Sequence, residues 1–65
     1  MVRWNYYSQD GAAMGASAEF DARATAEGWL GSEWEALLDQ GVETVALVDA
    51  SSGHELYRMP LGEDG

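Results

Sequence analysis

A single long segment, residues 22–40, constrains the fold most, because its apolar stripe can be buried only against another part of the chain. The apolar residues recur at the three- and four-residue spacing of one helical face, and Gly41 follows where a left-handed C-terminal cap is expected. Asp21 precedes the segment and suits the N-cap position. We therefore predict a helix over residues 22–40 that packs on a sheet. The stripe consists of Ala22, Ala26, Trp29, Leu30, Trp34, Leu37 and Leu38.

The stretch AEGWLGSEW, residues 26–34, raises the question of one helix or two. Gly28 and Gly31 together weaken a helix by about 2 kcal/mol relative to alanine. Residues 32–35 have the sequence of a capping box, which would start a second helix. The apolar stripe stays in phase across both glycines, and this favours a single helix.

The two tryptophans of this helix are expected to differ in burial. Because one helix on one sheet encloses a single layer, only part of the aromatic set can be core. We expect Trp34 to face the sheet, whereas Trp29, at the edge of the stripe, is expected to be partly exposed and to reach a partner. The expected core consists of Trp4, Tyr6, Phe20, Leu30, Trp34, Leu37, Val45 and Leu47.

A pair of strands is predicted on either side of the helix. Residues 2–7 and 16–21 both alternate apolar or small side chains with polar ones, and an Asp-Gly step lies between them. Alanine is a poor strand former, so an irregular loop over residues 9–18 is the alternative, which would leave a βαββ chain. Residues 43–49 are rich in β-branched side chains and are predicted to pair with residues 55–59.

The register of the second hairpin follows from its turn. If residues 51–53 form the loop, Leu47 falls opposite Tyr57 and Val45 opposite Met59. These four side chains then share the face that meets the helix.

The predicted fold class is α+β, with the order ββαββ and one helix packed across an antiparallel or mixed four-stranded sheet. Residues 1–61 form a single domain, and residues 62–65 are expected to be a frayed acidic tail.

The chain is strongly acidic, and its charge decides which partners suit it. Its 65 residues include twelve acids, three arginines and no lysine, for a formal net charge of −9. Nucleic acid and anionic lipid both require cationic surfaces, so we expect neither direct nucleic-acid binding nor membrane binding. Another protein with a basic surface is the natural complement. The N-terminal residues lack an apolar run of signal-peptide length, so we expect a cytoplasmic protein.

Catalysis is not expected. The chain has no cysteine and one histidine, His54, which follows a tight turn where a catalytic base could not easily be shielded from water. Structural zinc needs four nitrogen or sulfur ligands, and the acids lack the spacing of a calcium loop. We therefore predict no metal, no cofactor and no enzymatic activity.

The sheet face that the helix leaves uncovered is the predicted partner surface. Tyrosine, tryptophan and arginine are enriched in protein interfaces, and this face combines aromatic, aliphatic and arginine side chains. We expect a non-enzymatic protein-binding module, such as an adaptor, inhibitor or accessory subunit. Self-association as a homodimer through a sheet face or edge is compatible with this function. The predicted partner-binding residues are Tyr7, Trp29, Val48, Leu56 and Arg58.

An acidic helix surface supports an alternative function. Glu27, Glu35 and Asp39 lie on the polar side of the predicted helix, with no arginine to balance the last two. Such carboxylates could take the place of phosphates. The alternative is a nucleic-acid mimic that blocks the basic groove of a DNA- or RNA-handling protein.

Overall fold

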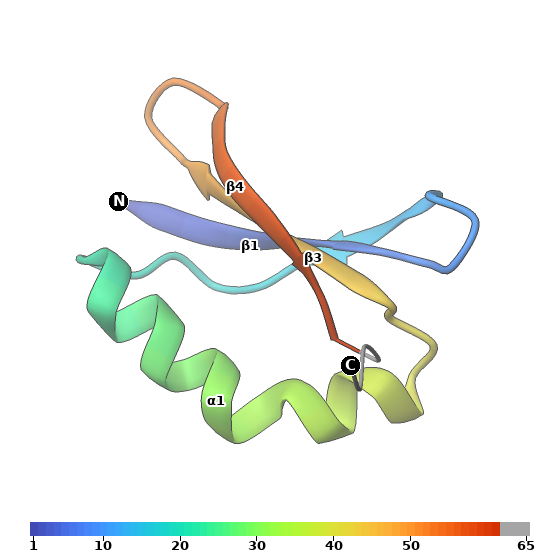
Figure 1. Cartoon of the computed structure of the whole chain (residues 1–65). Helices are drawn as coiled ribbons and strands as arrows, with labels where there is room; N and C mark the ends of the chain where they lie inside the picture. Colours follow the sequence, from blue (N-terminus) through green and yellow to red (C-terminus); the bar gives the residue numbers. More distant parts are fainter. Residues whose placement is uncertain (62–65) are drawn as a thin grey trace.

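The elements follow one another in the order ββαββ, and the computed structural model describes residues 1–61. The first hairpin joins β1 (Val2–Tyr7) to β2 (Ala13–Ala16), α1 (Arg23–Asp39) follows, and the second hairpin joins β3 (Thr44–Asp49) to β4 (His54–Pro60). All neighbouring strands are antiparallel, in the order β2-β1-β3-β4. The helix lies along one face of this sheet (Figure 1). The predicted α+β class is confirmed, while the expected tail, residues 62–65, lies outside the described residues.

The second strand is shorter and begins earlier than predicted. β2 ends at Ala16, and beyond it the only strand-like pairing is an isolated bridge at Phe20. The ladder is interrupted at Ser17, whose side-chain oxygen accepts the backbone N–H of Trp4 at 2.9 Å. A side chain thus replaces a backbone acceptor, and the predicted strand over residues 16–21 is wrong for that reason.

The helix α1 runs through Gly28 and Gly31 without a break, which confirms the single-helix prediction. Its N-cap residue is Ala22, with no side-chain hydrogen bond to the first turn. The predicted cap at Asp21 is wrong, because the helix begins one residue later than the sequence pattern indicated.

The C-terminus of α1 is closed by a Schellman motif. The N–H of Val42 donates to the carbonyl of Leu37 at 3.0 Å, and the N–H of Gly41 donates to the carbonyl of Leu38 at 3.0 Å. Val42 and Leu37 are both buried, which supplies the apolar contact that accompanies this motif. Gly41 has φ +96°, so the left-handed cap predicted at this position is confirmed.

Replacing Gly41 by alanine should lower the free energy of unfolding by about 1–2 kcal/mol, because an L side chain is strained at positive φ. The added Cβ would lie 3.7 Å from the Cε of Met14, an ordinary contact, so the loss is one of backbone strain. Urea unfolding followed by circular dichroism measures it. Gly28→Ala is the control, since alanine in the helix interior should stabilise by up to about 1 kcal/mol. Equal effects of the two variants would contradict the cap.

The second hairpin has the predicted register and a longer turn. Residues 50–53 connect the strands, and the N–H of Gly53 donates to the carbonyl of Asp49 at 2.7 Å. Nearer the turn the pairing shifts by one residue, so that Leu56 has no partner of its own on β3. Both predicted pairs are present: Leu47 opposite Tyr57, and Val45 opposite Met59.

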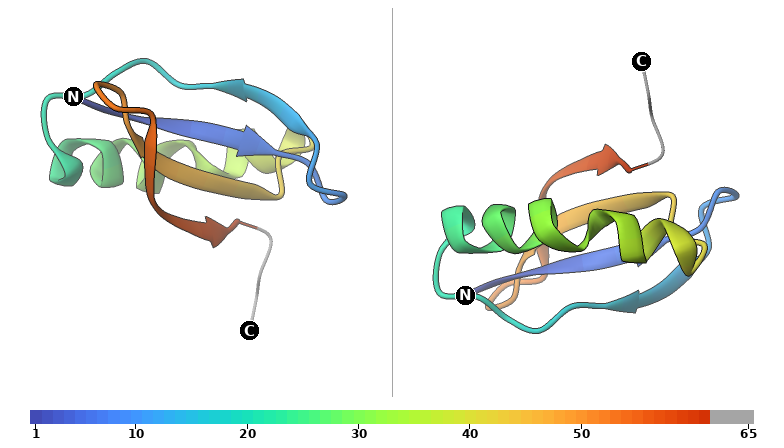
Figure 2. Two further views of the ribbon diagram at one scale, coloured as in Figure 1. Left: turned by 90° about the horizontal axis from the view of Figure 1, so that it is seen from above. Right: turned by 90° about the horizontal axis from the view of Figure 1, so that it is seen from below.

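The core lies between α1 and the two central strands. Figure 2 shows the helix along one face of the sheet, with the C-terminal end of β4 to the side of the helix. The indole N–H of Trp4 donates to the backbone carbonyl of Ala26 at 2.9 Å, which ties β1 to the helix. The largest fully buried side chains are Trp4, Leu47, Val42 and Val45.

The prediction that Trp34 is core is wrong, and Trp29 is the more buried of the two helical tryptophans. Trp34 is 43% exposed, whereas Trp29 is half-buried, with its ring centroid 5.5 Å from that of Phe20. Five residues of helix separate the two positions by about 140°, so they flank the buried stripe on opposite sides. The segment that carries Phe20 fills the side of Trp29. Within residues 1–61, nothing of comparable size fills the side of Trp34, which faces β4.

Candidate functional site

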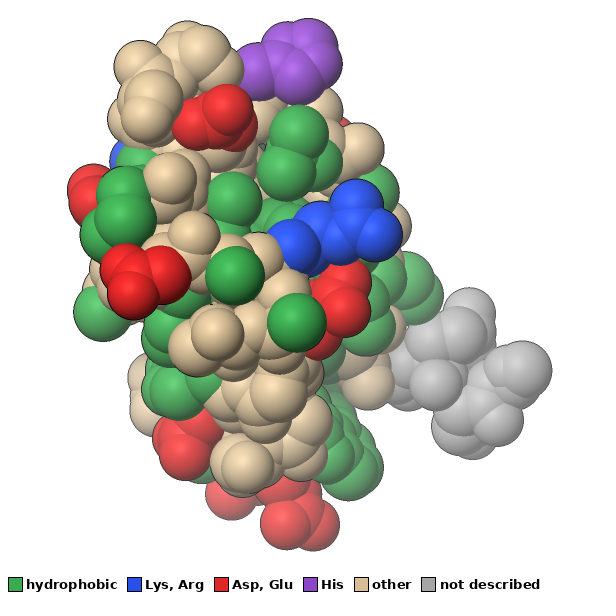
Figure 3. Space-filling model, turned by 90° about the vertical axis from the view of Figure 1, so that its left-hand side faces the viewer, with side chains coloured by type: hydrophobic (Ala, Val, Ile, Leu, Met, Phe, Trp, Pro, Cys, Tyr) green, Lys and Arg blue, Asp and Glu red, His purple; other side chains and the backbone are tan. Residues whose placement is uncertain are grey.

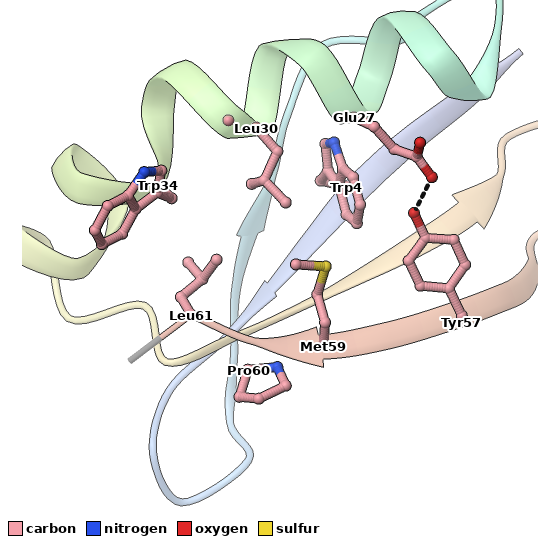
Figure 4. Close-up of a pocket in the computed structure, with 9 residues that line it drawn as sticks. Trp4, Glu27, Leu30, Trp34, Tyr57, Met59, Pro60 and Leu61 are labelled. Carbon is pink, nitrogen blue, oxygen red and sulfur yellow. Dashed lines mark hydrogen bonds between the residues drawn. The ribbon is translucent and has the colours of Figure 1, made fainter. Parts of the chain in front are cut away.

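An apolar groove runs between α1 and β4. Its volume is about 530 Å³. Figure 4 shows a carboxylate and a phenol at one end, and Trp34 with Leu61 at the other. Apolar side chains line most of the space between these ends. The lining residues are Trp4, Glu27, Leu30, Gly31, Trp34, Tyr57, Met59, Pro60 and Leu61.

The helix forms one wall of the groove because of its residue spacing. Glu27, Gly31 and Trp34 are four and three residues apart, so they lie on one side of α1. Gly31 in the middle has no side chain, and a Cβ placed there would meet nothing within 4 Å. The wall therefore has a notch between two large side chains.

The strand β4 forms the other wall through its alternation. Tyr57, Met59 and Leu61 point toward the helix in Figure 4. The N–H of Leu61 donates to the carbonyl of Glu43 at 2.8 Å, which fixes the end of this wall to the chain before β3. Met59 remains 37% exposed although it lies on the core face of the sheet. The helix does not cover this part of β4, so the groove stays open.

One end of the groove is closed by a hydrogen bond between helix and strand. The hydroxyl of Tyr57 donates to Oε2 of Glu27 at 2.6 Å, and the ring meets Trp4 edge-on, with centroids 6.0 Å apart. Burial, followed by the hydrogen bond to Glu27 and its negative charge, raises the pKa of Tyr57 to about 12. The phenol therefore remains protonated, and a donor, throughout the neutral range. Arg23 completes this end, with Nε 3.4 Å from Oε2 of Glu27.

The groove contains much of the exposed apolar surface of residues 1–61. Five large hydrophobic side chains are exposed among residues 1–61. Two of these five, Trp34 and Met59, line the groove. Leu56 is also exposed, but it is not part of the lining. An exposed tryptophan beside an apolar cavity is a common arrangement in binding sites.

The free edge of β4 adjoins the groove. Hydrogen-bonded and non-bonded pairs alternate along an antiparallel ladder. Because Leu61 bonds to Glu43, the backbone groups of every second residue back along β4 also face β3. The N–H and carbonyl of Arg58 therefore point to the free edge, as does the carbonyl of Pro60, which has no N–H.

The outer sheet face differs from the predicted partner surface. Val48, one of the predicted partner-binding residues, is only 4% exposed, so the expectation that its side chain lies exposed on this face is wrong. The guanidinium of Arg58 lies 5.1 Å from the centroid of the half-buried Tyr7 ring, and since β3 separates their strands, this side chain crosses β3. Arg58 is also held by Glu55, with Nη2 2.8 Å from Oε1. The side chain of Arg58 thus lies across part of this face.

The remaining predicted site residues do not form one surface. Leu56 is exposed near the second turn, while Trp29 is on the side of α1 away from the groove and packs on the core. Glu27, Glu35 and Asp39 are all exposed on α1, but only Glu27 lines the groove. Figure 3 shows acidic side chains in several separate places on one face, with apolar groups between them.

The described residues offer no dedicated metal site. Within residues 1–61, no three histidine, aspartate or glutamate side chains are gathered closely enough to hold a metal ion. No helix in this part of the chain is long and apolar enough to cross a membrane.

The chain matches no protein-family model, and it shows no significant similarity to a curated protein or to a solved structure. Its function must therefore be inferred from the groove. The sequence did not indicate that Gly31, Trp34 and Met59 line a groove. The available signal was the spacing of Glu27, Gly31 and Trp34 on one helix side, with a glycine between two large residues.

Proposed function

We propose that the chain is a non-enzymatic protein-binding module whose binding site is the groove between α1 and β4. The observation that carries this proposal is the open apolar cavity of about 530 Å³ beside the exposed Trp34. Its volume is in the range of ligand-binding clefts, and tryptophan is among the residues that contribute most to binding energy. The groove binds a linear segment of another protein. That protein is the target on which this chain acts as an adaptor or an inhibitor.

The composition of the groove supports binding rather than catalysis. Among the described residues that line it, the only charged side chain, Glu27, is hydrogen-bonded to Tyr57, and none is a serine, threonine, cysteine or histidine. Such a lining can hold apolar groups and orient one polar group. The one hydroxyl among the described lining residues, that of Tyr57, is a poor nucleophile because its pKa is raised to about 12 and it stays protonated at neutral pH.

Replacing Trp34 by alanine should weaken binding of linear peptides at least about tenfold, because it removes the largest exposed apolar group of the groove. Peptides selected from a phage-displayed random library on the wild-type chain serve as the probe, with affinity measured by fluorescence polarisation. Leu56→Ala is the matched control, since Leu56 is also 43% exposed and lies outside the groove. It should change affinity less than about twofold.

Three results would contradict this proposal. Selection of no peptide would remove the binding function. Binding that depends on Leu56 and not on Trp34 would place the site on the outer surface. Light scattering that gave a dimer for the wild-type chain and a monomer for Trp34→Ala would assign the groove to a second copy.

A further inference from the structure

The carboxylate of Glu27 has an unused oxygen at the groove. Both Tyr57 and Arg23 contact Oε2, and among the described residues no donor is hydrogen-bonded to Oε1. A carboxylate can accept about four hydrogen bonds, so Glu27 retains capacity for a cation. Arg23 lies one helical turn before Glu27, whereas Gly31 and the groove lie one turn after it. Glu27 can therefore hold its internal partners and meet an external donor on the groove side.

The negative charge of the chain favours a positively charged partner. The formal net charge is −9, and two of the three arginines, Arg23 and Arg58, already pair with glutamates. Potentials across an interface are usually complementary. A basic segment is attracted to this surface, while an acidic segment or a second copy of the chain is repelled.

The distance between Glu27 and Gly31 along the helix determines which two side chains of a bound segment can reach both positions. Glu27 and Gly31 are separated by four residues, about 6 Å along the helix axis. In an extended chain, side chains two residues apart point the same way and are separated by about 6.6 Å. No described strand pairs with the outer edge of β4, so the N–H and carbonyl of Arg58 can pair with such an extended segment there.

We infer that the groove binds an extended segment in which one residue separates an arginine or lysine from a large apolar residue. The cation binds Oε1 of Glu27, and the apolar group enters the notch at Gly31, between Glu27 and Trp34. This inference rests on the proposed function of the groove as a protein-binding site, and it adds the chemistry of the bound segment.

End-capped synthetic peptides test the inference. In the first, arginine and leucine are separated by one residue; in the second, citrulline, which is neutral and similar in shape, replaces arginine; in the third, arginine directly precedes leucine. We expect the first peptide to bind the wild-type chain at least about tenfold more tightly than either of the others. Glu27→Gln should remove the preference for arginine over citrulline. Glu35→Gln, which changes the net charge equally on an exposed position outside the groove, should retain it.

The outcomes separate this inference from the function on which it rests. Equal binding of the arginine and citrulline peptides, equal losses in the two glutamine variants, or no binding of the arginine peptide would overturn the inference. In each of these cases, library-selected peptides that still depend on Trp34 would leave the proposed function in place. Loss of that dependence on Trp34 would overturn both. Thermal melting of Glu27→Gln, whose amide oxygen can still accept from Tyr57, verifies that the variant is folded.

Discussion

Replacing Trp4 by alanine is expected to lower the free energy of unfolding by about 3–5 kcal/mol, which is most or all of the stability of a domain this small. The side chain is 0% exposed, so alanine leaves a large cavity between β1 and α1. It also removes the hydrogen bond to the Ala26 carbonyl, at 2.9 Å, and the edge-on contact with Tyr57. These losses act together because one indole ring joins the sheet, the helix and the closed end of the groove.

Urea unfolding followed by far-ultraviolet circular dichroism measures this loss. Trp34→Ala is the matched control, because it removes the same side chain from a position that is 43% exposed and should cost less than about 1 kcal/mol. Trp4→Phe keeps an aromatic ring and loses the indole donor, and it should fall between the two. If Trp4→Ala unfolded at the same urea concentration as Trp34→Ala, Trp4 could not be the centre of the core.

The fold was predictable because several local signals agree. Alternation marks β1, β-branched residues mark β3, and the turn of the second hairpin indicates that Leu47 pairs with Tyr57. The stripe of α1 ends at Gly41, whose positive φ only glycine adopts without strain. Each of these signals depends on neighbours in sequence. β2 was misplaced because its ladder ends at Ser17, where a side-chain hydrogen bond competes with backbone pairing.

The burial of the two helical tryptophans was not predictable from helical spacing alone. Trp29 and Trp34 flank the same stripe, so the periodicity treats them almost equally. The two tryptophans differ in their tertiary contacts: Phe20 packs beside Trp29, whereas a groove separates Trp34 from β4. The groove follows from this difference.

The outer sheet face was predicted to be an exposed apolar surface. Alternation shows which way a side chain points, but not whether neighbouring side chains cover it. Val48 points away from the helix as expected, yet it is buried. The long side chain of Arg58 crosses β3 to reach Tyr7 and is fixed there by Glu55. A sequence pattern that classifies arginine as polar does not anticipate that its side chain reaches across a strand to an aromatic ring.

Replacing Gly31 by leucine should abolish peptide binding while stabilising the fold. Leucine is a better helix former than glycine by about 0.8 kcal/mol, and a Cβ at this position meets nothing within 4 Å. The new side chain would therefore occupy the notch between Glu27 and Trp34 without displacing the core. Stability and binding are expected to change in opposite directions, which loss of folding cannot produce.

Gly28→Leu is the control for this prediction. Gly28 is also in the interior of α1, also has open space around it, and does not line the groove. Both variants should raise the urea midpoint by similar amounts, because the gain in helix propensity is the same. Only Gly31→Leu should lose affinity for the library-selected peptides, by at least about tenfold in fluorescence polarisation. If both variants bound these peptides as the wild-type chain does, the glycine would not be the entrance of a binding site. The groove would then be only a consequence of the twist of β4 and not a binding site.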